Sequence, residues 1–387
     1  MDDQQPFGDP GSKLLPAGLA DGLPPEAGHE SMLVARLVAR FAAQGYALVK
    51  PPLVEFEESL LSGIGAALRQ HCFRLMDPVS QRMMGVRPDI TPQVARIART
   101  RLARAPRPLR LCYAGEVLRV RGTQLRPTRQ FEQVGAEVIG ASSAAADAEA
   151  VVLGAGALEA IGVAGLSVDL CVPTLVPQLA EALGLAPGQV TGLRAALDRK
   201  DIAAVETALA GTHARAIPTV TALLRATGAA DQALAGLRRL DLPPAAAAER
   251  DRLTEVVELV RRAMPALTLT IDPVEMRGFE YDIGVSFTFF ARGVHGELGR
   301  GGRYMAAGAE PSTGFTLFMD AIAPALPPPP APRRAFLPLD TPQPVGAALR
   351  AEGWTTVAGL DAVTDAPAEA RRQGCTHCWR DGAVVAV

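Results

Sequence analysis

The chain has 387 residues, of which 48% are hydrophobic, and a formal net charge of −2 at pH 7. This length gives room for two or three domains with sizeable cores. The near-neutral charge predicts no general attraction to nucleic acids or membrane surfaces. The sequence has no run of about 18 apolar residues, so it contains no candidate membrane-spanning helix. The acidic, Pro- and Gly-rich N-terminus is unlike a signal peptide, and we expect a cytoplasmic protein.

The five cysteines are too few and too scattered for a disulfide framework. Cys375 and Cys378 form one CxxC pair, with His377 between them. A zinc site would need a second ligand pair at similar spacing, which the sequence lacks, and a redox pair would need a strand-to-helix setting. We therefore predict no bound metal and no cofactor.

The N-terminal part of the chain predicts a leader, a helix and an edge strand. Residues 1–13 have the composition of a disordered leader, and residues 27–44 carry apolar side chains at helical spacing. Residues 46–54 predict a strand that Pro51–Pro52 interrupts. Because proline cannot donate to a strand ladder, we expect an edge strand or a dimer contact here.

A strand region and a helix come next. Residues 73–84 have mixed strand character, and residues 86–101 predict a helix. Asp89 or Thr91 can cap this helix, and Pro92 suits its first turn.

Arginine dominates the region from Arg82 to Arg129, with twelve arginines against two acidic residues, Asp89 and Glu116. Such a local field suits a phosphate-bearing ligand, RNA or an acidic partner. The alternative is a plain surface in a chain that has only three lysines and uses arginine for every basic role.

Residues 109–140 predict a β-hairpin. Polar and apolar residues alternate with period two over 109–121 and 129–139, and a polar turn joins the two runs. Parity places Arg119 and Arg121 on one face of the first strand, and Arg129, Gln133 and Glu137 on one face of the second. Small apolar residues occupy the opposite faces, so we expect a core side and a charged, ligand-binding side.

The remaining elements alternate between helix and strand. We predict a helix at 142–162, a strand at 167–172, helices throughout 174–266, and strands at 267–290, 294–304 and 313–319. The expected domains are a core of 14–172 and 267–325, a helical insertion at 173–266, a Pro-rich linker at 326–333, and a small α/β domain at 334–387.

Five polar clusters lie on or beside the predicted strands: RPDIT (87–91), LRVR (118–121), RQFEQVGAE (129–137), RGFEYDIG (277–284), and GRGGRY (299–304) with STGFTLFMD (312–320). Together, in this order, they resemble the catalytic core of a class II aminoacyl-tRNA synthetase, specifically the histidyl enzyme. The resemblance covers residues 14–325. It implies an α+β fold, with an antiparallel sheet flanked by helices, an inserted helical region and a small C-terminal α/β appendage.

The resemblance also implies an amino-acid pocket. Arg119 matches an arginine of the second class motif and presents a forked donor set for a carboxylate or phosphate. The other implied ligand-binding residues are Gln133 and Glu137 for the amino group of histidine, Asp89 and Thr91 beside them, Arg277 for a carboxyl or phosphate, and Tyr281 as a pocket wall.

Three positions depart from the synthetase pattern. Arg121 replaces a glutamate that helps to hold ATP, Ala321 replaces an arginine that grips its phosphate tail, and Asp282 replaces a tyrosine of the histidine signature. Losing one charge-assisted contact to a polyphosphate typically costs about 1.5–3 kcal/mol. The C-terminal domain is also smaller than an anticodon-binding domain. From these departures we expect no aminoacylation.

A synthetase-like core that keeps an amino-acid pocket and loses ATP chemistry resembles one family, the regulatory subunits of ATP phosphoribosyltransferase. The segment VRPDITPQVARIART (86–100) is also similar to that family. The resemblance implies a non-catalytic subunit, needed with a short catalytic subunit for the first step of histidine biosynthesis. It further implies a homodimer within a hetero-octamer, and histidine as the effector of feedback inhibition. We expect no membrane or nucleic-acid partner.

Two alternatives stay open. The chain could be a divergent histidyl-tRNA synthetase in which Arg303 supplies the missing third-motif arginine. The polar residues could also satisfy one another as cross-strand pairs, such as Arg119 with Glu137 and Arg129 with Glu132. Buried charge pairs are costly without a ligand or water, which argues against this for the whole set.

Overall fold

The computed structural model describes residues 15–123, 126–276, 282–306 and 310–387. The predicted leader at 1–13 lies outside these residues. The chain divides into two compact units, Met1–Pro327 and Pro328–Val387. The boundaries of the predicted helical insertion stay a prediction.

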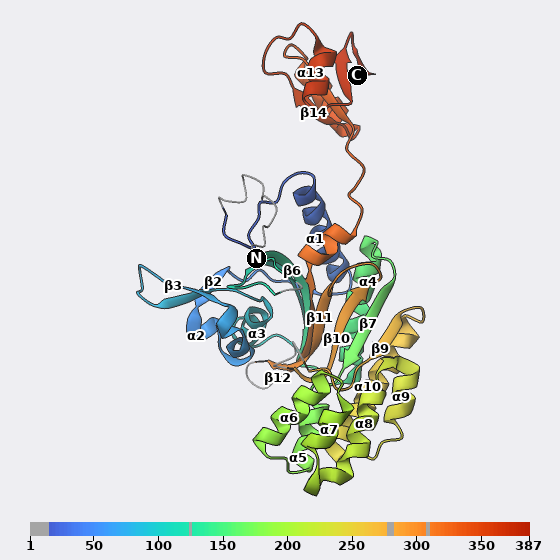
Figure 1. Ribbon diagram of the computed structural model, residues 1–387. Coiled ribbons are helices and arrows are strands. Elements are labelled where there is room, and N and C mark those ends of the chain that lie inside the picture. Colours follow the sequence, from blue (N-terminus) through green and yellow to red (C-terminus); the bar gives the residue numbers. More distant parts are fainter. Residues whose placement is uncertain (1–14, 124–125, 277–281, 307–309) are drawn as a thin grey trace, which may run out of the picture. The chain divides into compact units, whose positions relative to one another are not determined.

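A large mixed sheet forms the centre of the first unit (Figure 1). Its neighbouring strands pair antiparallel, except that β1 is parallel to β5 and β7 is parallel to β9. Among the described residues it has nine strands, in the spatial order β1 (Ala47–Leu48), β5 (Leu109–Leu118), β6 (Gln130–Ile139), β12 (Glu310–Phe318), β11 (Gly299–Ala306), β10 (Asp282–Ala291), β7 (Leu166–Cys171), β9 (Thr268–Ile271) and β8 (Gly228–Ala229). The predicted hairpin at 109–140 and the predicted α+β class are confirmed.

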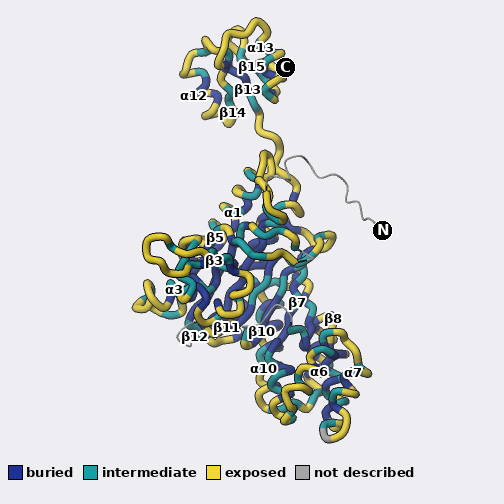
Figure 2. The backbone as a smooth tube through the Cα atoms, turned by 60° about the vertical axis from the view of Figure 1, so that its left-hand side comes forward, coloured by how far each residue is buried: buried dark blue, intermediate teal, exposed yellow. Residues whose placement is uncertain are grey.

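Helices cover both faces of this sheet. Helices α1 (Glu26–Ala42) and α4 (Ala144–Ile161) bury their apolar side chains with the even-numbered residues of β6, such as Val134 and Val138. Helix α3 (Thr91–Thr100) packs against the odd-numbered face, which carries Tyr113, Val117 and Phe131. Each fully buried large apolar side chain contributes about 1.5–3 kcal/mol. Figure 2 shows this burial concentrated along the strands.

The predicted strand at 46–54 is split into β1 and β2 (Val54–Phe56), because Pro51–Pro52 offers no N–H donors to a ladder. The edge position is confirmed, since β1 lies at one end of the large sheet. Strand β2 belongs to a separate small sheet with β4 (Met83–Val86) and β3 (Phe73–Met76). Helix α2 (Glu57–Leu60) and the 3₁₀ helix η2 (Gly63–His71) connect β2 to β3, and α11 (Met319–Ile322) and η4 (Ala323–Ala325) follow β12.

The stretch from 174 to 266 is mostly helical, as predicted, but residues 228–229 form strand β8 at the far edge of the large sheet. Gly228 has φ +130°, a backbone conformation that interrupts a helix. The helices of this stretch are α5 (Leu175–Ala182), α6 (Pro187–Asp198), α7 (Ile202–Ala208), η3 (Gly211–Ala216), α8 (Ile217–Arg225), α9 (Ala230–Leu237) and α10 (Pro244–Ala263).

The second unit is a small α/β structure with a four-stranded sheet. Its elements are β13 (Arg334–Leu337), α12 (Gln343–Ala351), β14 (Thr355–Ala358), α13 (Ala366–Arg372), β15 (His377–Arg380) and β16 (Ala383–Ala386). Strand β15 includes Cys378, the second cysteine of the CxxC pair. Cys375 and Cys378 are free, buried thiols that pack with Phe336 and Ala370.

Within the described ranges, no helix has the length and apolar character that crossing a membrane requires. The same residues contain no group of three or more His, Cys, Asp or Glu side chains arranged to hold a metal ion.

Candidate functional site

A cavity of about 300 Å³ lies beside the β5–β6 hairpin. Strands β11 and β12 supply much of its wall through close-packed glycines and through Tyr304 and Phe315. Four of the predicted site residues line it, and they are Asp89, Thr91, Arg119 and Glu137. Arg277 and Tyr281 lie outside the described residues. A larger hollow of about 440 Å³, beside Glu159 and Arg292, is lined by none of the predicted site residues that the structure describes.

Glu137 is the buried carboxylate of this cavity, with 1% of its surface exposed. Tyr304 donates a hydrogen bond to its Oε2 at 3.0 Å, and Tyr113 approaches its Oε1 at 3.4 Å. Burial raises the pKa of Glu137 to about 8, with Asp89 adding to the rise while the hydroxyl of Tyr304 opposes it. A carboxylate in this setting gains stability from a cationic ligand.

Gln133 acts behind the cavity wall and holds Asp89. It is fully buried, its Nε2 donates to Asp89 Oδ2 at 3.0 Å, and its Oε1 accepts from the backbone N–H of Ile90 at 3.1 Å. Asp89 Oδ1 in turn accepts from the backbone N–H of Thr91 at 2.9 Å, at the start of α3. The amide therefore fixes a second carboxylate at the acidic end of the cavity.

Basic side chains line the cavity as well. Arg119 donates from Nε to the carbonyl of Pro88 at 3.3 Å, and its guanidinium lies 5.1 Å from the ring centre of Phe131. Arg300 and His71 also line the cavity. A ligand with separated positive and negative groups, such as an amino acid, fits this distribution of charge.

Three lining or supporting residues were missed from the sequence. Tyr304 reaches Glu137 from β11, and Tyr113 joins Thr91 to Thr316 through oxygen–oxygen distances of 3.2 and 2.7 Å. Tyr113 shares the parity of the predicted polar face, so that pattern could have found it. Tyr304 and Thr316 reach the cavity because of the order of strands in the sheet, which has no local sequence signal.

Asp282, which replaces a tyrosine of the histidine signature, lies at the start of β10 and lines the cavity. Ser286 donates to its Oδ2 at 2.8 Å, and β-sheet register places Asp282 opposite Tyr304. A side chain at Gly302 would meet this carboxylate at 2.7 Å, so the glycine lets it lie close to the sheet.

The residues at the positions that hold ATP in a synthetase differ from those of the synthetase pattern. Arg121 is exposed, and Ala321 offers only a methyl group. Arg126 was not among the predicted site residues. Its guanidinium lies 3.8 Å from the ring centre of Phe318 and forms an ion pair with Asp320 at 3.3 Å. The chain's own guanidinium therefore covers the aromatic surface next to the cavity.

The predicted cross-strand pairs are not formed among the described residues. Glu137 bonds to tyrosine hydroxyls, and Arg129 donates from Nε to the carbonyl of Arg119 at 3.1 Å. The expected charged face of the hairpin is also wrong in part. It is a buried surface that carries Phe131 and Ile139 as well as polar groups, because α3 covers it.

Comparisons with known proteins show the family and the fold of the chain. A family model described as histidyl-tRNA synthetase matches residues 18–322. An ATP phosphoribosyltransferase regulatory subunit of Rhodospirillum centenum is 57% identical over 97% of this chain and 96% of its own length. A crystal structure from Bacillus halodurans, described as an ATP phosphoribosyltransferase regulatory subunit/histidyl-tRNA synthetase, has a TM-score of 0.81. It covers 94% of this chain and 97% of its own at 23% identity, which shows the same fold.

A chain of the ATP phosphoribosyl transferase (HisG:HisZ) complex of Thermotoga maritima shares the fold too, with a TM-score of 0.59. It covers 75% of this chain and 97% of its own at 16% identity. The resemblance found in the motifs is confirmed at high identity along nearly the whole chain. The chain belongs to the family of ATP phosphoribosyltransferase regulatory subunits, which have the histidyl-tRNA synthetase fold.

Proposed function

We propose that this chain is a non-catalytic subunit that assembles with a short catalytic subunit of ATP phosphoribosyltransferase. In this role it is required for the first step of histidine biosynthesis, and it binds histidine as the feedback effector. The observation that carries the proposal is a cavity lined by two carboxylates, those of Glu137 and Asp89. The guanidinium of Arg126 stacks on Phe318, an aromatic side chain of the cavity wall.

The acidic end supports an amino-acid ligand. An ammonium group needs a carboxylate, and the raised pKa of Glu137 means that a cation brought to it relieves an unfavourable buried charge. Arg119 and Arg300 provide donors for the ligand carboxylate. Asp282 offers an acceptor for a ring N–H, which suits imidazole.

The positions that hold ATP in a synthetase support the non-catalytic role. Phosphoryl transfer and adenylation depend on cationic side chains that stabilise a polyphosphate. Ala321 cannot supply such a contact, and Arg121 lies exposed where the synthetase pattern has a glutamate that helps to hold ATP. The divergent synthetase remains the second candidate, and Arg303, its substitute arginine, is engaged with Asp147 at 2.7 Å.

Reconstitution tests the proposal. The purified chain is mixed with a short-form catalytic subunit, and phosphoribosyl transfer to ATP is measured with and without L-histidine. We expect the mixture to be active, the chain alone to be inactive, and histidine to inhibit the mixture. A chain that activates no short-form catalytic subunit contradicts the proposal, and histidine-dependent ATP–pyrophosphate exchange by the chain alone establishes the synthetase instead.

The proposal includes a homodimer within a cytoplasmic hetero-octamer. Leu48, in the edge strand β1, and Leu53, which follows Pro51–Pro52, have exposed apolar side chains, which supports self-association at this edge. Light scattering of the chain alone and of the mixture measures both states. A monomer at micromolar concentration contradicts the dimer.

A further inference from the structure

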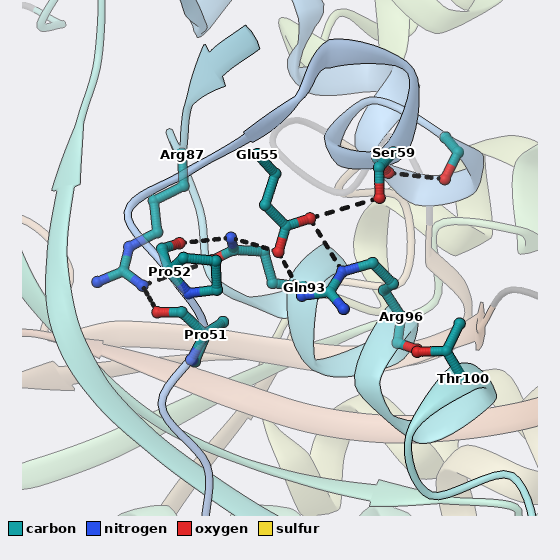
Figure 3. A network of polar contacts seen from close by, with 9 residues as sticks. Pro51, Pro52, Glu55, Ser59, Arg87, Gln93, Arg96 and Thr100 are labelled. Carbon is teal, nitrogen blue, oxygen red and sulfur yellow. Dashed lines mark hydrogen bonds and ion pairs between the residues drawn. The ribbon is translucent and has the colours of Figure 1, made fainter. Parts of the chain in front are cut away.

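The segment 87–96, which includes the first turns of α3, has two sets of polar contacts. On one side Asp89 and Thr91 line the cavity. Its other polar side chains, Arg87, Gln93 and Arg96, contact the segment Pro51–Glu55 instead (Figure 3). The cavity wall therefore shares one short stretch of backbone with a second polar network.

Glu55 is the centre of that network. Its carboxylate accepts two hydrogen bonds from Arg96, one from Nε at 2.9 Å and one from Nη2, and a third from Gln93 Nε2 at 3.0 Å. Only 8% of the Glu55 side chain and 22% of the Arg96 side chain are exposed. A forked, largely desolvated ion pair of this kind fixes both geometry and register.

Two further side chains fasten the same segment to the two prolines. Gln93, which is 1% exposed, donates to the carbonyl of Pro52 at 2.7 Å. Arg87 donates from Nη1 to the carbonyl of Pro51 at 2.9 Å and from Nε to that of Glu116 at 2.7 Å. Burial lowers the pKa of Arg87. The bonds to Pro51 and Pro52 satisfy carbonyls that lie outside the strands.

Loss of the Glu55 charge would leave the Arg96 guanidinium without its counter-ion and Gln93 without one acceptor. Groups left in this state recover solvent contacts by moving, and both are on α3. Asp89 and Thr91 lie at the start of the same helix, so any shift of α3 moves the cavity wall.

We propose that Glu55 is a positioning residue for the cavity. Glu55 is not among the residues that line the cavity. Through Arg96 and Gln93 it fixes the start of α3, and with it the Asp89 carboxylate and the Thr91 hydroxyl. The identity of the ligand rests on the proposed function, whereas the positioning of the wall does not.

The test compares Glu55→Gln with Glu149→Gln in the full-length chain. Glu149 makes a matched forked pair with Arg110, at 2.6 and 2.8 Å, and also accepts from Tyr46. Within the described residues it makes no hydrogen bond to 87–96. Amide hydrogen exchange is measured without ligand, followed by calorimetric titration with L-histidine. In Glu55→Gln we expect at least fivefold faster exchange at Ile90 and Thr91, whose N–H groups bond to Gln133 and Asp89.

We also expect at least a fivefold rise in the Kd of histidine for Glu55→Gln, and values near those of the wild type for Glu149→Gln. Unchanged exchange at Ile90 and Thr91 overturns the proposal. The proposal is also overturned if amide exchange in β12 accelerates as much as exchange at Ile90 and Thr91, because that indicates a general loss of stability. A wild-type chain that binds no histidine defeats the proposed function, while the exchange result still decides the positioning role. If Glu55→Gln does not fold, Arg96→Lys, which keeps the charge and loses the fork, gives the same exchange readout.

Discussion

Tyr304 of β11 donates a hydrogen bond to Glu137 of β6, with 3.0 Å between Oη and Oε2. Strand β12 lies between these two strands, and its Gly314 is paired with Glu137. The hydrogen bond joins β11 to β6 inside the cavity and holds the Glu137 carboxyl in one orientation. Burial of the carboxyl and the nearby Asp89 charge raise the pKa of Glu137, and the hydroxyl of Tyr304 opposes part of that rise. The protonation of Glu137 therefore connects ligand binding, stability and pH.

The first prediction concerns stability. The pKa of Glu137 rises from 4.5 to about 8 on folding, so between these values the folded chain holds a proton that the unfolded chain releases. Stability from this group is complete below pH 4.5 and is lost as pH rises through 8. We expect Glu137→Gln to remove this loss, on the order of 2–4 kcal/mol between pH 5 and 9. Urea unfolding at both pH values measures it, and equal pH slopes in variant and wild type contradict it.

The second prediction concerns histidine affinity. The ligand ammonium binds the ionised form of Glu137, so affinity rises toward pH 8 and binding releases a proton below that pH. Glu137→Gln should weaken binding about 10- to 150-fold at pH 8, since a charge-assisted hydrogen bond contributes about 1.5–3 kcal/mol. Calorimetry in two buffers of different ionisation enthalpy measures both affinity and proton release. Unchanged affinity, or no proton release by the wild type, counts against the role of Glu137.

The third prediction tests the packing beneath that carboxylate. A Cβ added at Gly314 would overlap the Glu137 carboxylate and crowd the carbonyl of Ala136. We expect Gly314→Ala to displace Glu137 and lower histidine affinity at least tenfold. Gly156→Ala is the control, because that helical position has open space around it and alanine favours a helix. Calorimetric titration of both variants with histidine measures the two affinities. A wild-type affinity in Gly314→Ala would contradict the close packing of Gly314 against Glu137.

Part of this site could be predicted from the sequence because period-two parity is a local property. Parity placed Gln133 and Glu137 on one face of a strand, and the structure brings that face to Asp89 and Thr91. The same parity places Phe131 and Ile139 on that face, and these apolar side chains lie in the core beneath α3. A strand covered by helices on both sides loses the simple alternation of polar and apolar residues.

The rest of the site depends on which strands become neighbours. Tyr304 is far from Glu137 in sequence and meets it because β12 lies between β6 and β11. The Arg126–Phe318 contact likewise joins a turn to a distant strand end. Such long-range contacts carry no local sequence signal, and the motif resemblance supplied only the approximate region.

The fourth prediction concerns a buried charge cluster that ties α10 and α4 to β11. Asp147 is fully buried between Arg252 at 2.8 Å and Arg303 at 2.7 Å. Asp147→Asn leaves two guanidinium groups near a neutral amide, and we expect a loss of about 3–5 kcal/mol in the free energy of unfolding. Asp231→Asn, which removes the exposed partner of Arg261, should cost less than about 1 kcal/mol. Urea unfolding of both variants measures the difference, and similar losses would argue against a structural role for Asp147.

The fifth prediction concerns the CxxC pair. Cys375 and Cys378 are buried in the core of the second unit, and burial raises the pKa of Cys378. A thiol reacts as its thiolate, so both should react slowly with a disulfide reagent in the folded chain. The remaining cysteines are also buried, and the chain should release all five thiols only in denaturant. Spectrophotometric thiol counting over time makes the measurement, with the denatured chain as the reference. Two thiols that react rapidly in the folded chain, or a zinc ion bound in equal amount and removed by a chelator, would identify the pair as a redox or metal site instead of core packing.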